Sequence, residues 1–281
     1  MSDSTMDVLF VIDATGSMSS AIRAATDRVT TIAAELEREH SDTDIRFGSI
    51  CYRDPVDVRG EKHEVHPFGD IHSLHNFLKT IDATGGGDGP EDWVGALRHA
   101  LDLNWRDGTR TMIWVADAPA HGCTFCGYNN HEDQTELLPP LIRRVAEMQI
   151  YFQALDMGAE RTFRAIKAIY EEAQGPHFTI SPFNPGRGTV RREVVVPVVS
   201  TDVLGRDFSE ADYPKDYSSD DGYDSDSESH DVPMRKYRPP VYDTESVARA
   251  YTEVIEERAP TMEEAIVRAT MDICRAARTH V

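Results

Sequence analysis

The feature that most constrains this chain is an apolar run that ends abruptly in oxygen-bearing side chains. Met6–Ile12 (MDVLFVI) is followed at once by Asp13-Ala14-Thr15-Gly16-Ser17. A short continuous apolar run is typical of a strand buried on both faces of a parallel sheet. Gly16 then permits a tight turn. We therefore expect a central strand whose carboxyl end presents one carboxylate and two hydroxyls.

Strand-like and helix-like segments alternate through the first two thirds of the chain. Further strands are predicted over 44–52, 64–68, 111–116, 150–155 and 177–180, and helices over 17–37, 71–81, 93–103, 137–148 and 161–173. This alternation predicts an α/β fold, a doubly wound and mostly parallel sheet flanked by helices. Such sheets bind ligands at the carboxyl ends of their strands, where Asp13 and Asp117 are expected to lie.

The composition changes in the last third. We expect a first domain over residues 5–182, a β-prone extension over 183–200, an acidic low-complexity linker over 201–240, and C-terminal helices over 241–281 that pack on the first domain. The stretch 202–231 is rich in Asp, Ser, Glu and Tyr, which predicts a disordered loop. Helical periodicity returns over 245–255 and 262–277. Ser218 and Ser225 precede acidic residues, so they are either kinase targets or part of a solvated charged linker.

Charge and cysteine content exclude several classes of protein. The 281 residues carry a formal net charge of -20, which repels phosphate backbones, so no nucleic-acid partner is expected. Four cysteines are too few for a disulfide scaffold. The N-terminus lacks a signal-peptide pattern, and no run approaches the roughly 18 apolar residues of a membrane span. We expect a soluble protein of a reducing compartment, cytoplasmic and not bound to membranes.

Oxygen ligands follow several of the predicted strands. Hard divalent cations prefer such ligands. Asp13, Thr15 and Ser17 share one turn, Asp88 lies in a glycine-rich loop, and Asp117 follows the fourth strand. Together they predict an octahedral cation site, although Asp13 and Ser17 could instead cap the first helix.

Four motifs carry a resemblance to a known family. They are DATGSM at 13–18, YRD at 52–54, GGGDGPED at 85–92 and DAPAHG at 117–122. Together they resemble the intracellular-type subgroup of von Willebrand factor A domains, with a metal-ion-dependent adhesion site. The resemblance covers roughly residues 5–182 and implies a Rossmann-like fold.

The resemblance also implies how the site is built. Thr15 and Ser17 would bind the metal through their hydroxyls, and Asp13 and Asp117 directly or through water. Asp88 would take the position of the second loop, for which the sequence offers three alternatives: Thr84, Glu91 and Asp92. The expected cation is Mg²⁺, with Mn²⁺ or Ca²⁺ as alternatives.

The function implied by the resemblance is protein binding, in which the cation captures an acidic residue of a partner protein. We therefore expect no enzymatic activity. One alternative is a metal-dependent hydrolase that uses the same site, with His121 as a general base. The chain lacks a Ser-His-Asp order, and TGGGDG lacks the Lys-Ser/Thr of a phosphate-binding loop. A second alternative is a metal-free scaffold that binds through the acidic tail.

Two further groups of residues are candidates for a role. His121, Cys123, Cys126 and His131 could form a second site for zinc. The alternative is a loop with two thiols or a reversible redox pair. Arg53 and Asp54 could orient the metal loops from behind, or form an ordinary surface salt bridge.

Overall fold

The computed structural model describes residues 4–54, 63–87, 89–127, 134–183, 189–198, 249–258 and 260–278. The chain forms two compact units, one made of 1–186 and 260–281 and the other of 187–259. Each unit is considered separately. Asp88, His131 and the acidic stretch 202–231 lie outside the described residues.

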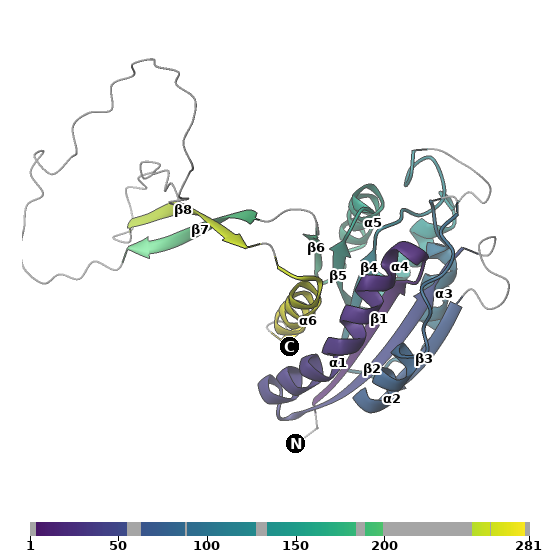
Figure 1. Ribbon diagram of the computed structural model, residues 1–281, viewed down its shortest axis with the longest axis horizontal. Helices are drawn as coiled ribbons and strands as arrows, with labels where there is room; N and C mark the ends of the chain where they lie inside the picture. The colour runs from purple at the N-terminus through teal and green to yellow at the C-terminus, as the bar shows by residue number, and fades with distance from the viewer. Residues whose placement is uncertain are drawn as a thin grey trace, which may run out of the picture. The chain divides into compact units, whose positions relative to one another are not determined.

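A single sheet organises the first unit. Its strands are β1 (Ser4–Asp13), β2 (Thr43–Tyr52), β3 (His63–Gly69), β4 (Thr109–Ala116), β5 (Ile150–Asp156) and β6 (Phe178–Pro182). Their order is β3-β2-β1-β4-β5-β6 (Figure 1). All neighbours are parallel except β3, which pairs antiparallel with β2 at the edge. The predicted fold class, a doubly wound and mostly parallel sheet, is confirmed.

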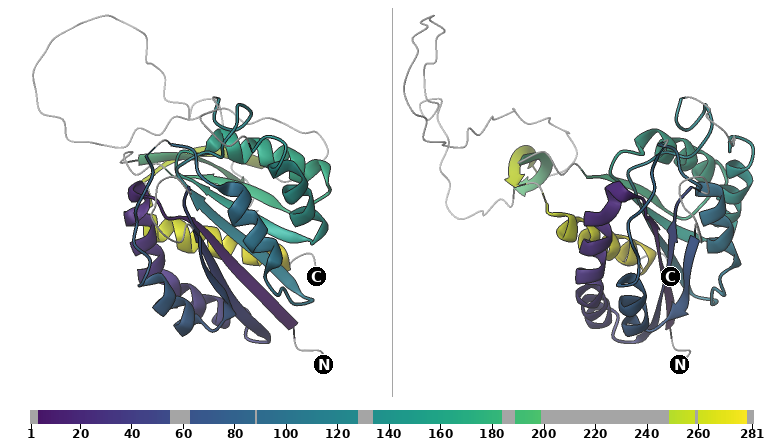
Figure 2. Two further views of the ribbon diagram at one scale, coloured as in Figure 1. Left: turned by 90° about the vertical axis from the view of Figure 1, so that its right-hand side faces the viewer. Right: turned by 45° about the vertical axis from the view of Figure 1, so that its right-hand side comes forward.

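Helices cover both faces of this sheet (Figure 2). One layer contains η1 (Gly16–Met18), α1 (Ser19–Glu39), α2 (Ile71–Leu78) and α6 (Met262–Arg278), and the other contains α3 (Trp93–Asp102), α4 (Leu138–Glu147) and α5 (Glu160–Glu172). Successive residues of β1 alternate between the two cores, because side chains of a strand point to opposite faces. Phe10 and Ile12 pack in the first core and Leu9 and Val11 in the second. None of the helices in the described ranges has the length and apolar character that a membrane span requires.

The strand order creates a switch point at the centre of the sheet. β2 and β4 lie on either side of β1. The strands that follow β1 in sequence are therefore added first on one side of it (β2 and β3) and then on the other (β4 to β6). Asp13 is the last residue of β1, and Asp117 directly follows β4. Both carboxylates therefore start from the edge of the sheet where doubly wound folds bind their ligands.

The last helix, α6, completes the core of the first unit. It packs against α1 and lies beside β4 and β5. Ile273 and Cys274 are fully buried, and Arg275 Nη2 forms an ion pair with Glu39 Oε1 of α1 at 2.7 Å. A segment that follows the acidic stretch in sequence thus covers part of one face of the central sheet.

The second unit corrects one prediction. It contains β7 (Thr189–Val198) and β8 (Arg249–Arg258), which pair antiparallel along their whole length. The helix predicted over 245–255 is wrong over its described part, because residues 249–255 belong to β8. Four residues of this segment are β-branched or aromatic types that favour extended backbone: Tyr251, Thr252, Val254 and Ile255. Pairing with the valine-rich strand β7 stabilises that conformation. The helix-like spacing came from apolar residues that recur at i, i+4, i+7 and i+8, namely Val247, Tyr251, Val254 and Ile255.

We predict that the packing of α6 contributes strongly to stability. Ile273→Ala should lower the free energy of unfolding by about 2–5 kcal/mol, because it leaves a cavity under the helix. Arg268→Ala, on the exposed side of α6, should change it by less than about 0.5 kcal/mol. Urea unfolding of the full chain measures both. Equal effects from the two variants would show that α6 does not bury this face in solution.

Candidate functional site

The turn after β1 holds its own carboxylate in place. Asp13 is fully buried, and its Oδ1 accepts hydrogen bonds from Thr15 N at 3.0 Å and Thr15 Oγ1 at 2.7 Å. Thr15 Oγ1 lies 3.3 Å from Ser17 Oγ, and Ser17 is exposed. The residues that cap η1 and α1, Thr15 and Met18, make no side-chain capping bond. The turn therefore presents a row of oxygens that leads from the interior to the surface.

Two carboxylate oxygens at the end of the central strands lack hydrogen-bond partners. Asp13 Oδ2 and Asp117 Oδ1 are both buried, and neither accepts a hydrogen bond from the described residues. Buried polar atoms are normally satisfied, so two such oxygens on neighbouring loops have room for a hydrogen-bond donor or a positive group.

The electrostatics of Asp13 agree with this interpretation. Burial raises the pKa of Asp13 to about 7, the Asp117 carboxylate adds to the effect, and hydrogen bonds from Thr15 and from the Ala118 backbone oppose it. Burial also raises the pKa of Tyr52, and the negative charges of Asp13, Glu91 and Asp117 raise it further. Negative charge therefore gathers at one end of the sheet, where it is poorly solvated.

The glycine-rich loop lies directly on this turn. Gly16 N donates to Gly85 O at 3.3 Å, and Thr84 N donates to Ala14 O at 3.1 Å. Gly86 has φ +90°, and a Cβ there would lie 3.3 Å from Thr15 Cβ. Glycine is required here both for the backbone conformation and for the close approach.

The three alternatives for the second loop have different surroundings. Thr84 is exposed and next to the turn. Glu91 is buried, and its Oε2 accepts from the Asp54 amide at 2.6 Å. Asp92 caps α3, accepting from Gly95 N at 2.8 Å, and lies 3.2 Å from His63 Nε2. Because Glu91 and Asp92 already bind other groups, Thr84 is the described alternative best placed to supply a ligand.

Arg53 connects the loops behind the turn. It is 2% exposed, and its Nε donates to Ala14 O at 3.0 Å while its Nη2 donates to Asp82 O at 2.6 Å. It also forms an ion pair with Glu64 of β3. An ordinary surface salt bridge would have none of these buried carbonyl partners. Arg53 thus joins the turn after β1 to the segment before the glycine-rich loop.

Asp54 and His121 form a second buried connection. Asp54 Oδ2 is paired with His121 Nε2, and both residues are nearly inaccessible. Glu91 and Ala120 form a β-bridge beside them. The loop that carries Asp117 is therefore joined to the end of β2 and to the segment before α3.

The structure does not bring the described zinc candidates together. His121 turns toward Asp54, Cys126 Sγ donates to Gly122 O at 3.3 Å, and Cys123 is exposed. In the described ranges, no three side chains of His, Cys, Asp or Glu are arranged to hold a metal ion. The fourth candidate, His131, lies outside those ranges, so the complete zinc site stays a prediction. Asp88, the predicted ligand from the glycine-rich loop, also lies outside those ranges and stays a prediction.

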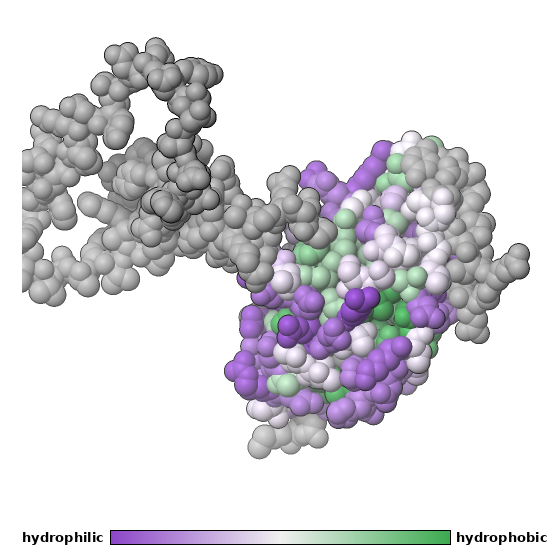
Figure 3. Space-filling model, in the orientation of Figure 1, coloured by the Kyte–Doolittle hydropathy of each residue, from purple (hydrophilic) through white to green (hydrophobic). Residues whose placement is uncertain are grey.

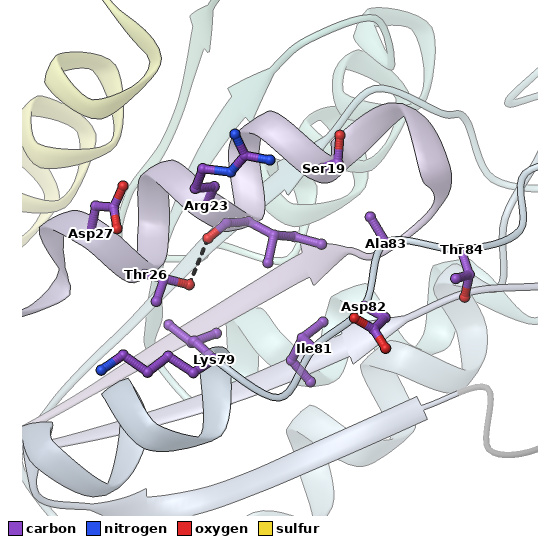
Figure 4. A pocket seen from close by; sticks show the side chains of 11 residues that line it. Ser19, Arg23, Thr26, Asp27, Lys79, Ile81, Asp82, Ala83 and Thr84 are labelled. Carbon is purple, nitrogen blue, oxygen red and sulfur yellow. Dashed lines mark hydrogen bonds between the residues drawn. The ribbon is translucent and has the colours of Figure 1, made fainter.

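A groove that the sequence did not reveal lies beside the turn. It measures about 460 Å³ and runs between α1 and residues 78–84. Figure 4 shows Arg23 and Asp27 along α1, opposite Lys79 and Asp82. The face that α1 occupies is hydrophilic around its outline and hydrophobic in a smaller central area (Figure 3). The two walls are far apart in sequence and share no motif, so only the fold could reveal the groove.

We predict that Asp13 destabilises the chelator-treated protein at alkaline pH. Because its folded-state pKa is about 7, above the ordinary value, the folded chain binds more protons than the unfolded chain between about pH 4 and pH 7, and stability falls as pH rises through this window. Asp13→Asn should therefore raise the free energy of unfolding at about pH 8 and change it little at about pH 4.5. Urea unfolding at both pH values measures this. A variant less stable at both would show that the charge of Asp13 is not costly.

Known proteins resemble part of this chain. Residues 7–125 match the family model of the von Willebrand factor A domain. The chain is 36% identical over 122 residues to the alpha-protein kinase vwkA of Dictyostelium discoideum, covering 43% of this chain and 19% of the kinase. It is 30% identical over 118 residues to the putative ariadne-like RING finger protein R811 of Acanthamoeba polyphaga mimivirus, covering 41% of this chain and 11% of that protein. The matched region is thus a fifth or less of either relative.

Solved structures give more distant similarities. The SpRpn10 VWA domain has 13% identity and a TM-score of 0.44, covering 63% of this chain and 88% of that domain. The open form of the pilus adhesin SpaC from Lactobacillus rhamnosus GG has 12% identity and a TM-score of 0.47, covering 64% and 28%. The family match includes both Asp13 and Asp117, and it supports a von Willebrand factor A domain in this chain.

Proposed function

We propose that this chain is a protein-interaction module that holds a divalent cation at the turn after β1 and uses it to bind an acidic residue of a partner protein. The proposed ligands are Asp13, Thr15, Ser17 and Asp117, with one more from the glycine-rich loop. Mg²⁺ is the expected ion, because it accepts few protein ligands and keeps several waters.

The observation that carries the proposal is the pair of unsatisfied oxygens, Asp13 Oδ2 and Asp117 Oδ1. Leaving two carboxylates buried without positive partners is costly. A divalent cation would offset that cost, and the hydroxyls of Thr15 and Ser17, 3.3 Å apart, are suitable further donors. The donor set consists only of oxygen, as a hard cation prefers.

The exposure of the turn supports binding of a partner. Asp13 and Thr15 are buried, whereas Ser17 is exposed. A cation held by all three would therefore have protein on its inner side and solvent on its outer side. A carboxylate could reach it from solvent, and the chain around that carboxylate could lie in the neighbouring groove.

The surroundings of His121 support a binding role over a catalytic one. A general base must reach the proton that it abstracts. His121 is 1% exposed, and its Nε2 is held by Asp54. The residue that favoured the hydrolase alternative thus has a structural contact that explains its presence.

The first prediction concerns the cation itself. Calorimetric titration of Mg²⁺, Mn²⁺ and Ca²⁺ into the chelator-treated 281-residue chain should show one cation per chain. Asp13→Ala should abolish binding. Ser17→Ala should raise the dissociation constant by about tenfold or more, which corresponds to ~1.4 kcal/mol of binding free energy for each factor of ten. The loss follows because each variant removes one proposed donor.

Two matched variants serve as controls. Asp156→Ala removes a carboxylate from the end of the neighbouring strand β5, and Ser20→Ala removes an exposed hydroxyl of α1. Both should bind the cation as the unmodified chain does. If the unmodified chain binds no cation at millimolar concentration, the proposal is wrong, and the acidic stretch 202–231 becomes the better candidate for partner binding.

The second prediction concerns carboxylate capture. With Mn²⁺ bound, N-acetylglutamate methylamide should displace a metal-bound water and lower the proton relaxation enhancement of the solvent. The corresponding glutamine compound has the same shape without the charge and should have no effect at equal concentration. Equal effects of the two compounds, or none from either, would contradict capture of an acidic residue even if the cation binds.

A further inference from the structure

Two thiols share one exposed turn near the candidate site. Cys123 and Cys126 lie in the segment after the loop of Asp117, with Cys123 exposed and Cys126 half-buried. Gly122 O accepts hydrogen bonds from both Phe125 N and Cys126 N at 3.0 Å, so the backbone closes a single helical turn. The proposed cation site uses neither thiol.

The turn has suitable geometry for a disulfide. Residues three apart in a helical turn lie on the same face. Helix dimensions place their Cα atoms about 5 Å apart, within the range of about 4.4–6.8 Å that a disulfide spans. Cys123 and Cys126 can therefore be joined with little movement of the backbone.

Neighbouring residues hold this turn firmly. Arg161 of α5 donates from Nη2 to Cys123 O at 2.8 Å and from Nε to Thr124 O at 3.0 Å. Phe125, between the thiols, is 1% exposed and packs in the core. These contacts use carbonyl groups and an apolar ring, so oxidation of the thiols leaves them intact. A turn held in this way limits the motion of both cysteines and favours an internal disulfide over two separate adducts.

We propose that Cys123 and Cys126 form a redox-active dithiol that exchanges with low-molecular-weight disulfides such as glutathione disulfide. The exposed Cys123 thiolate attacks one sulfur of the disulfide, forming a mixed disulfide and releasing one glutathione. The Cys126 thiolate then attacks Cys123 Sγ, which forms the internal disulfide and releases the second glutathione. The chain loses two electrons and two protons, and the two glutathione molecules gain them.

Oxidation changes one contact next to the loop of Asp117. The thiol of Cys126 donates to Gly122 O at 3.3 Å, and the disulfide has no hydrogen to donate. Gly122 follows His121, whose side chain is paired with Asp54. The dithiol thus lies at the end of the loop that supports the candidate site, but its chemistry does not require a bound cation.

The chain contains its own reference thiols. Cys51 and Cys274 are fully buried, and burial raises the pKa of each thiol to about 12. Reaction with a disulfide requires the thiolate and access to it. In the folded protein these two thiols should stay reduced under conditions that oxidise the exposed pair.

The test equilibrates the reduced 281-residue chain, in chelator, with glutathione buffers of increasing oxidised-to-reduced ratio. Remaining thiols are then alkylated and mapped by peptide mass spectrometry. We expect Cys123 and Cys126 to lose alkylation together, with a peptide lighter by two hydrogen atoms, while Cys51 and Cys274 remain reduced. Cys126→Ser should stop at a glutathione adduct on Cys123. Arg161→Ala should require a severalfold higher ratio, because it loosens the turn.

Three results would overturn the proposal. The first is independent glutathione adducts on Cys123 and Cys126 without an internal disulfide. The second is no oxidation of the pair at ratios that oxidise a model dithiol peptide. The third is isolated protein that carries one zinc ion per chain and exposes both thiols only after chelation, which would make the pair a metal site. Because the readout is the disulfide itself, each result is independent of whether the turn after β1 binds a cation.

Discussion

The burial of one carboxylate at the end of the central strand is the constraint on which the rest of this site depends. Asp13 ends a strand that is covered on both faces, so the fold removes its side chain from water. Thr15 satisfies one of its oxygens, and the other remains without a partner. Burial of an ion is tolerated only when charge or hydrogen bonds compensate it. The loops around β1 supply part of that compensation, and a cation would supply the rest.

The loops around the turn after β1 are connected to one another. Arg53 links the turn to the segment before the glycine-rich loop through the carbonyls of Ala14 and Asp82. The bridge between Glu91 and Ala120 links the segment after that loop to the loop of Asp117. The acceptors in these contacts are backbone carbonyls, which do not change with protonation. Only the acidic side chains that they surround are left to respond to a cation or a proton.

Much of this arrangement could be predicted from the sequence because it is local. The apolar run Met6–Ile12 predicts a strand, and the turn directly after it carries the oxygen-bearing side chains. Asp117 follows an equally clear strand. The role of Arg53 was harder, since an arginine after a strand is compatible with a surface salt bridge until its carbonyl partners are known. The groove beside α1 could not be predicted, because residues such as Arg23 and Lys79 become neighbours only through the strand order. The helix expected over 245–255 is wrong over 249–255, because apolar residues at helical spacing also suit a strand, and pairing with β7 makes this segment one.

The position of α6 links the packing of the core to the geometry of the candidate site. The domain's central strands need cover on the face that α1 only partly shields, and α6 provides it from the far end of the chain. Its contacts with β4 and β5 reach the strands whose ends carry Asp117 and Asp156. A change that loosens α6 would therefore let β4 shift relative to β1. Since Asp13 and Asp117 belong to those two strand ends, the separation of the two carboxylates depends on packing at the opposite end of the sequence.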